Sequence, residues 1–117
     1  QSKEELLELD TWDKLAGNTY VATNNGSFAH SGFVTDLLAE KISNYDLVYA
    51  CGPRPMLSKV SEIARRYNKK HYLVMEEIMA CGFGLCMGCA LETKQGIKHI
   101  CKDGPVFDGD QIKWNND

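Results

Sequence analysis

The stretch "ACGFGLCMGCALETKQGIKHIC" (Ala80–Cys101) decides how the last third of the chain folds, because it holds four of the five cysteines. They follow the pattern C-x4-C-x2-C-x11-C, as Cys81, Cys86, Cys89 and Cys101. Four thiols at this density are typical of a disulfide framework, a zinc site or an iron–sulfur site. A segment this short buries little apolar surface, so we expect disulfides or a bound metal to stabilise its fold.

The spacing favours a 2Fe–2S cluster over the alternatives. Disulfides need an oxidising compartment, to which nothing in the sequence points, and Cys51 would remain unpaired. Zinc sites are commonly built from two C-x2-C knuckles, but only Cys86 and Cys89 form one. C-x4-C-x2-C followed by a distant cysteine is the plant-ferredoxin spacing. Zinc, or no metal at all, stays open as an alternative.

The residues between the ligands agree with a cluster. Gly82, Gly84 and Gly88 allow the backbone to turn sharply and to approach inorganic sulfide closely. Backbone N–H groups can then point at sulfur, which helps to set a reduction potential. We expect the Gly82–Met87 turn to lie at the surface, with Phe83 and Leu85 available for contact.

Composition excludes several classes of protein. The chain has 117 residues, 44% hydrophobic and 25% charged, as expected of one modest globular protein. The net charge is -3 and basic residues form no run, so we expect no nucleic-acid partner. The longest apolar runs are far shorter than a membrane span, so we expect a cytoplasmic protein. The chain begins with Gln1 rather than Met, which suggests a fragment or a processed product.

The first part of the chain predicts an α/β fold. Apolar residues recur at helical spacing in 3–15, 32–42 and 54–67, and strands are expected at 19–22, 45–51 and 69–77. We expect the strand ending at Cys51 to be buried. This alternation predicts a partial parallel sheet with helices. After Met79, short strands are expected at 90–93, 98–101, 104–107 and 111–114, with a turn at 94–96. We therefore place a boundary between residues 1–78 and a small β-rich domain, 79–117.

The histidines and the paired glutamates favour structural roles. His30, His71 and His99 share no metal-ligand spacing, and we expect His30 at the surface and the other two in strands. Glu76 and Glu77 are adjacent at the end of a strand, so they point to opposite faces. We expect them to be solvated charges at a hinge rather than a catalytic pair.

Several motifs resemble one family. "ACGPRPML" (Ala50–Leu57) resembles the end of the nucleotide-binding domain in the ferredoxin–NADP reductase superfamily. "MEEIMACGFGLCMGCALET" (75–93) and "ICKDGPVFDGDQIKW" (100–114) are similar to the electron-transfer subunits of type B dihydroorotate dehydrogenases. "GSFAHSGFVTDLL" (26–38) also resembles these subunits, so the resemblance covers nearly the whole chain.

The resemblance implies a role in pyrimidine biosynthesis. In this family an FMN-containing catalytic subunit oxidises dihydroorotate, and electrons pass through a 2Fe–2S cluster to FAD and then to NAD. The cluster ligands correspond here to Cys81, Cys86, Cys89 and Cys101. Cys51 and Gly52 match a pair that lies near the nicotinamide and the flavin. The full-length subunit is expected to form a hetero-oligomer with the catalytic subunit.

The chain also departs from the family pattern. We find no FAD-binding barrel and no glycine-rich phosphate loop, which would hold a pyrophosphate at a helix N-terminus. We therefore expect a C-terminal piece, inactive alone, with the ligands for the cluster, no FAD site and at most part of an NAD site. The alternatives are a zinc-stapled interaction domain and the flavoprotein subunit of a related ferredoxin-dependent NAD(P) oxidoreductase. The latter places an aspartate at the first ligand position, and Cys81 argues against it.

Overall fold

The structure is a computed structural model that describes residues 2–114. The chain forms two compact units, Gln1–Lys41 and Ile42–Asp117. The boundary that we predicted near residue 78 falls inside the second unit and stays a prediction. Within the described residues, none of the helices has the length and apolar character needed to cross a membrane.

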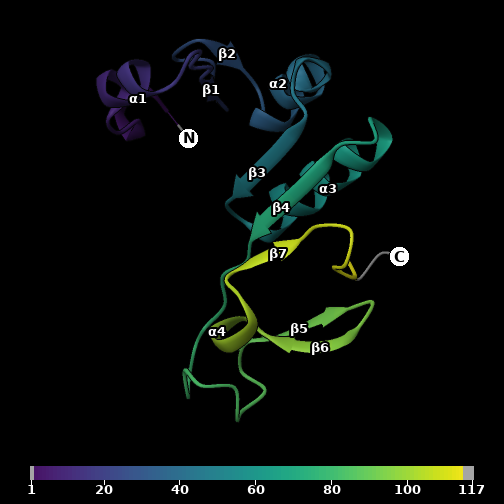
Figure 1. The fold of residues 1–117 in the computed structure, drawn as a ribbon. Coiled ribbons are helices and arrows are strands. Elements are labelled where there is room, and N and C mark those ends of the chain that lie inside the picture. Colours follow the sequence, from purple (N-terminus) through teal and green to yellow (C-terminus); the bar gives the residue numbers. More distant parts are fainter. Residues whose placement is uncertain (1, 115–117) are drawn as a thin grey trace. The chain divides into compact units, whose positions relative to one another are not determined.

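The first unit is mainly helical (Figure 1). Its elements are η1 (Lys3–Glu5), α1 (Leu9–Leu15), β1 (Ala22–Thr23), β2 (His30–Ser31) and α2 (Val34–Lys41). The helix that we expected over residues 3–15 is interrupted, because Glu8 adopts a positive φ of 56° just before α1. The strand expected at 19–22 begins only at Ala22, and it pairs in parallel with β2 rather than with the larger sheet.

The second unit is organised around a three-stranded sheet (Figure 1). Its elements are η2 (Ile42–Asn44), β3 (Leu47–Cys51), α3 (Arg54–Arg66), β4 (Lys70–Val74), β5 (Ala90–Thr93), β6 (Gly96–His99), α4 (Ile100–Asp103) and β7 (Val106–Asp108). Strands β3 and β4 run parallel, with Val48 opposite His71, and β7 adds antiparallel on the other side of β4. The strand order is therefore β3-β4-β7, which confirms the α/β class with small sheets.

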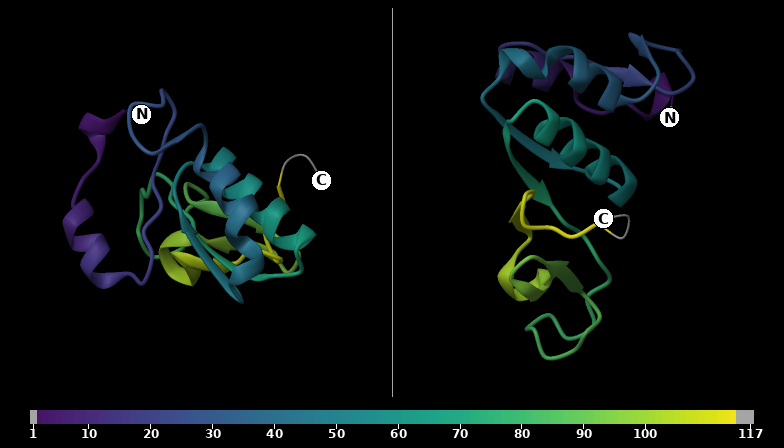
Figure 2. Two further views of the ribbon diagram at one scale, coloured as in Figure 1. Left: turned by 90° about the horizontal axis from the view of Figure 1, so that it is seen from above. Right: turned by 90° about the vertical axis from the view of Figure 1, so that its right-hand side faces the viewer.

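Helix α3 covers one face of this sheet, as the views in Figure 2 also show. Pro55 lies in its first turn, where a missing N–H costs little. Its apolar side is buried with the strand residues that face it: Leu57, Val60, Ile63, Ala64, Val48 and Leu73. Because each side chain alternates along a strand, the opposite face carries Tyr49 and Tyr72, whose rings stack 5.3 Å apart.

Our prediction that β3 is a buried strand is wrong for three of its five residues. Tyr49 is 66% exposed, and Leu47 and Cys51 are exposed as well. The physical reason is that β3 is an edge strand of the three and that α3 covers only the Val48 face. A continuous apolar run is typical of a strand buried on both faces, and the run alone does not tell how many faces are covered.

The C-terminal part of the second unit contains an antiparallel hairpin of β5 and β6, followed by α4. The predicted turn at 94–96 joins the two strands. The strand expected at 98–101 ends at His99, because Ile100 already begins α4. The strand expected at 111–114 is reduced to a single bridge from Ile112 to Thr93. Buried apolar side chains fill this region: Leu91, Ile100, Phe107 and Ile112.

A polar contact ties the chain after β7 to β4 and α3. Gly109 donates its N–H to the His71 carbonyl at 3.0 Å and accepts from Arg65 Nη2 at 3.0 Å. The His71 ring is fully buried, 2.9 Å from Ser61 Oγ and 3.2 Å from the Lys69 carbonyl. This network agrees with the structural role that the sequence predicts for His71.

Candidate metal centre

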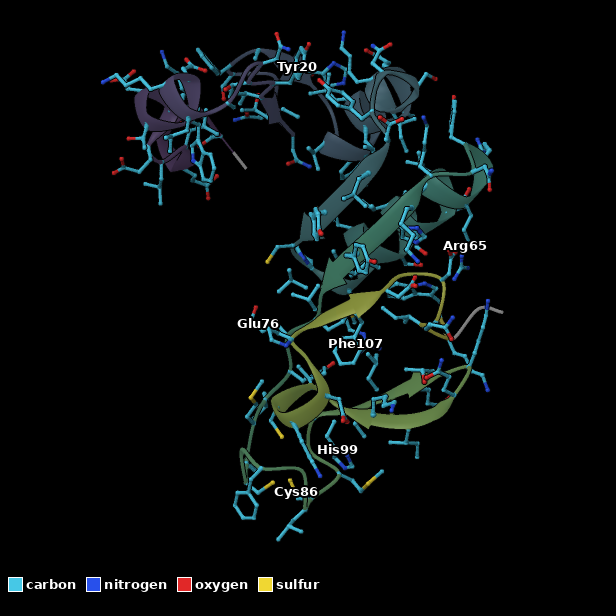
Figure 3. All side chains as sticks on the ribbon, in the orientation of Figure 1. Tyr20, Arg65, Glu76, Cys86, His99 and Phe107 are labelled. Atoms are coloured by element: carbon cyan, nitrogen blue, oxygen red, sulfur yellow. The ribbon has the colours of Figure 1, made fainter. Side chains whose placement is uncertain are left out.

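The cysteines that we predicted as ligands come from two segments of the second unit. Cys81 and Cys86 lie in the irregular loop between β4 and β5, and Cys89 stands at its end, directly before β5. Cys101 lies in α4, which follows β6. The hairpin brings the segments together, since the Ile100 N–H donates to the Cys89 carbonyl at 3.1 Å. Figure 3 shows sulfur atoms beside Cys86, around this loop and α4.

The four thiols contact one another in pairs. The thiol of Cys86 lies close enough to that of Cys81 to influence its pKa, and the thiol of Cys89 lies close enough to that of Cys101 to do the same. Cys101 also lies close enough to Cys81 for their charges to interact. The four predicted ligands therefore lie as two neighbouring pairs in one part of the second unit, and their role as ligands stays a prediction.

Backbone N–H groups surround the sulfur of Cys81. The N–H of Cys86 donates to it at 3.5 Å, and those of Phe83 and Leu85 also point at it. These donors stabilise the thiolate and lower the pKa of Cys81 to about 6. The Gly88 N–H likewise donates to the sulfur of Cys86 at 3.5 Å.

The other pair lies in a drier environment. Cys89 is only 1% exposed. Burial, followed by the contact with Cys89, raises the pKa of Cys101, although the Gly84 N–H acts in the opposite direction. The two pairs thus differ in how well their surroundings tolerate negative charge.

Gly84 fits closely against α4. Its φ is +83°, a conformation that side chains disfavour, and a Cβ there would lie 2.9 Å from Cδ of Lys102. The aliphatic stem of Lys102 thus packs against the backbone that donates to Cys101. A glycine is required at this position by both conformation and space.

The donor set suits iron and sulfide. Thiolates are soft ligands that select zinc, copper(I) or iron–sulfur clusters, and backbone N–H groups aimed at sulfur are typical of the last class. Within residues 2–114, three or more Cys, His, Asp or Glu side chains do not converge closely enough to enclose one metal ion. The paired thiols are an arrangement in which each pair could hold one of two irons.

The loop carries apolar side chains on its outer side. Phe83 is 62% and Leu85 is 79% exposed, and Met87 and Ile78 are exposed too. This is the surface that we expected at the Gly82–Met87 turn.

Cys51 and Gly52, which the resemblance placed near a nicotinamide, lie apart from the loop at the end of β3. Cys51 is exposed, and Gly52 has a φ of +154° with Met56 packed against its Cα. Ligands of parallel sheets bind beyond the carboxyl ends of the strands, which is where both residues are found.

The structure also contains an ion pair near this edge that the sequence analysis did not predict. Arg54, at the start of α3, pairs with Glu77, which follows β4. We had expected Glu77 to be a solvated charge. The signal for a partner was weak, because the two residues are 23 positions apart and belong to separate elements.

Residues 76–113 match the family model described as the iron–sulfur cluster binding domain of dihydroorotate dehydrogenase B. The matched residues run from just after β4 to near the end of the described chain and include all four cysteines of the metal centre. Over nearly its whole length the chain is also similar to curated proteins with a related name, "Dihydroorotate dehydrogenase B (NAD(+)), electron transfer subunit". The protein from Clostridium perfringens is 38% identical over 96% of this chain. That from Caldanaerobacter subterraneus subsp. tengcongensis is 38% identical over 94% of it.

The chain spans under half the length of these relatives, 45% and 46% respectively. A solved structure, the NADH-dependent reduced ferredoxin–NADP oxidoreductase studied for flavin-based electron bifurcation, superposes with a TM-score of 0.83. It is 27% identical and matches 99% of this chain and 42% of that one. The resemblance that we noted to the electron transfer subunits of dihydroorotate dehydrogenase B is thereby confirmed, and the fold is similar to that of the ferredoxin–NADP oxidoreductase.

Proposed function

We propose that the iron–sulfur domain holds a 2Fe–2S cluster through the thiolates of Cys81, Cys86, Cys89 and Cys101. The observation that carries this proposal is that Cys86 lies near Cys81 and Cys89 lies near Cys101, so that the four thiols form two pairs. A binuclear cluster needs two thiolates on each iron, and the spacing is that of plant-type ferredoxins. One pair would hold each iron.

The chain's own residues prepare the site for such a group. Backbone N–H groups of the loop stabilise thiolate charge at Cys81, and burial keeps water from Cys89. Gly84 lets the loop close over Cys101 and Lys102. A 2Fe–2S cluster supplies one-electron transfer, which links flavins that exchange electrons singly or in pairs.

In the complete subunit, we propose that the domain relays electrons between the FMN of a dihydroorotate dehydrogenase catalytic subunit and FAD and NAD. The names of the relatives support this role, since they are electron transfer subunits of an NAD(+)-dependent enzyme. Cys51 and Gly52 would contribute to the nicotinamide end. The exposed Phe83 and Leu85 offer a surface for the catalytic subunit, because an apolar patch beside a redox centre favours docking. The cytoplasm is the compartment that we propose.

The test is an iron, acid-labile sulfide and zinc count on anaerobically prepared protein, together with its visible spectrum. Two irons and two sulfides per chain with a red-brown spectrum would support the proposal. A colourless protein with one zinc per chain would support the zinc-stapled interaction domain instead.

Substitutions sharpen the assignment of the ligands. Each of Cys81→Ser, Cys86→Ser, Cys89→Ser and Cys101→Ser should lower the iron content, because a hard oxygen is a poorer ligand for this class of site. Cys51→Ser is the matched control, since Cys51 lies on the sheet and not in the loop. Loss of iron from Cys51→Ser with a normal Cys101→Ser protein would contradict the ligand set.

A further inference from the structure

An ion pair lies at the point where the chain leaves the sheet for the metal-binding loop (residues 75–89). Glu77 follows β4 in this exit from the sheet and pairs with Arg54, the first residue of α3. Figure 3 labels the neighbouring Glu76 at the same exit. The pair therefore joins the start of the loop to the helix that begins just after Cys51 and Gly52.

The exit segment, residues 76–80, has little else to hold it. Before it, Met75 is buried, and its N–H donates to the Pro105 carbonyl at 2.9 Å. Within residues 2–114, no backbone hydrogen bond joins the exit segment to another part of the chain. Ile78 is 87% exposed, so apolar burial does not anchor this stretch either. The Glu77 side chain thus supplies a polar contact where the backbone makes none.

The other end of the pair is firmly held. The Leu57 N–H donates to the Pro53 carbonyl at 3.0 Å, which fixes the first turn of α3, and the Leu57 side chain is buried. A cation in the first turn of a helix opposes the helix dipole, and the first turn of α3 has no acidic residue to offset it. The charge of Arg54 therefore does not serve α3 itself, and its carboxylate partner comes from the exit segment.

Other ion pairs of the described residues connect different parts of the chain. Glu62 pairs with Lys59 and Arg66 inside α3, and further pairs join α3 and β4 to β7 or to the turn behind it. Among the pairs in this part of the chain, Arg54–Glu77 is the one that reaches the metal-binding loop. Its side chains are 43% and 30% exposed, so solvent and salt screen the pair only in part.

We propose that Arg54 and Glu77 form a tether that holds the entrance of the metal-binding loop at the sheet edge where Cys51 and Gly52 lie. Arg54 is a positioning residue in this role, because it acts on the loop through Glu77 and touches no reacting atom. The consequence for electron transfer rests on the proposed function: a relay between a cluster and the nicotinamide end needs a fixed separation between the two.

The experiment uses the whole chain with its metal bound and follows the release of that metal to an excess of chelator. The variants are Arg54→Ala, Glu77→Ala and the double variant. Glu76→Ala is the matched control, because it removes a neighbouring exposed carboxylate. Lys59→Ala is a second control, since it breaks an ion pair that lies within α3.

We expect Arg54→Ala and Glu77→Ala each to release metal about two- to fivefold faster than the wild type, which is the effect of a partly exposed ion pair on opening of the loop. The double variant should match either single variant, because all three lack the same interaction. At an ionic strength of about 1 M the wild type should approach the variants, since salt screens the pair. Both controls should keep the wild-type rate.

A nitroxide on the exposed thiol of Cys51 gives a second measurement, which general destabilisation of the fold would not reproduce. The distribution of distances from this label to the reduced cluster should broaden in Arg54→Ala and stay narrow in Lys59→Ala.

Several results would overturn the proposal. These are unchanged release in both single variants, an effect of Glu76→Ala as large as that of Glu77→Ala, additive effects in the double variant, or a distance distribution that does not depend on Arg54. Failure of the proposed function would look different, because the wild-type protein would then contain zinc. The rates of zinc release from the same variants would still decide whether the tether exists.

Discussion

Replacing Gly109 with alanine should strongly destabilise the second unit. A Cβ at this position would overlap Cδ2 and Nε2 of His71 and lie 3.0 Å from Cγ. The ring cannot easily move away, because Ser61 and the Lys69 carbonyl hold its two nitrogens at 2.9 and 3.2 Å. The backbone is fixed too, since Gly109 is hydrogen-bonded to His71 and Arg65.

The expected loss of stability depends on whether the backbone or the His71 ring moves to relieve the overlap. Overpacking of a buried site costs about 1–3 kcal/mol. If the ring is displaced, a buried hydrogen bond is lost at about 1–3 kcal/mol more. We therefore expect Gly109→Ala to lower the free energy of unfolding by about 2–5 kcal/mol, a large fraction of the ~5–15 kcal/mol that stabilises an ordinary domain.

The assay is urea unfolding followed by circular dichroism, on samples of equal metal content. Gly17→Ala is the matched control, because a Cβ at Gly17 would meet no atom within 4 Å. In a His71→Ala background the additional cost of Gly109→Ala should fall below about 1 kcal/mol, because the overlapping ring is gone. An equal cost in both backgrounds would refute the reasoning.

Three further predictions concern the loop and the sheet. Gly84→Ala should lower the cluster content after gel filtration, because a side chain at φ +83° is strained and crowded, whereas Gly88→Ala should be milder, since its Cβ would meet atoms only at 3.5 Å or more. Asp108→Asn should destabilise the fold slightly at neutral pH. Burial raises the pKa of Asp108, but its hydrogen bond with Lys70 and other contacts outweigh this and lower the pKa overall. The stabilisation is thus present above about pH 4, the unfolded pKa, and is lost as the pH falls through the lower folded pKa, so urea unfolding of the two proteins should converge in acid. Phe83→Asp in the full-length complex should slow electron transfer from dihydroorotate to NAD but largely preserve NADH oxidation by an artificial acceptor.

Each of these has a result that would count against it. Normal cluster content in Gly84→Ala would show that the loop relaxes at no cost. A stability difference between wild type and Asp108→Asn that grows in acid would contradict the direction of the pKa. For Phe83→Asp, Ile97→Asp is a control at another exposed apolar site, on β6. Equal loss of both rates, or a bleached spectrum, would argue against docking at the turn.

The elements with a strong apolar period were predictable from the sequence. Helix α3 and strands β3 and β4 occur within a few residues of their expected positions, because side-chain periodicity and Pro55 mark them locally. The spacing also indicated that Cys81, Cys86 and Cys89 share one loop, but the role of these residues and Cys101 as ligands stays a prediction.

Contacts between distant segments were not predictable in the same way. The exposure of Tyr49 depends on which faces of the sheet are covered, and the run "LVYAC" carries no information about that. The pairing of Arg54 with Glu77 and the place of Gly109 over His71 depend on how β4 and β7 meet. A single sequence gives no local signal for such encounters.

Strand β7 makes the metal-binding loop part of the sheet's own architecture. The chain leaves the sheet after β4, passes through all four thiols and returns to pair beside the strand that it left, with Leu73 opposite Phe107. Closing the loop between β4 and β7 costs conformational entropy. The pairing of β7 with β4, together with any metal bound by the thiols, offsets that cost. Removing residues from the loop through β7 would leave β4 paired with β3 alone and would expose its other edge. Because an unpaired edge is a known template for aggregation, this segment cannot be excised without harm to the sheet.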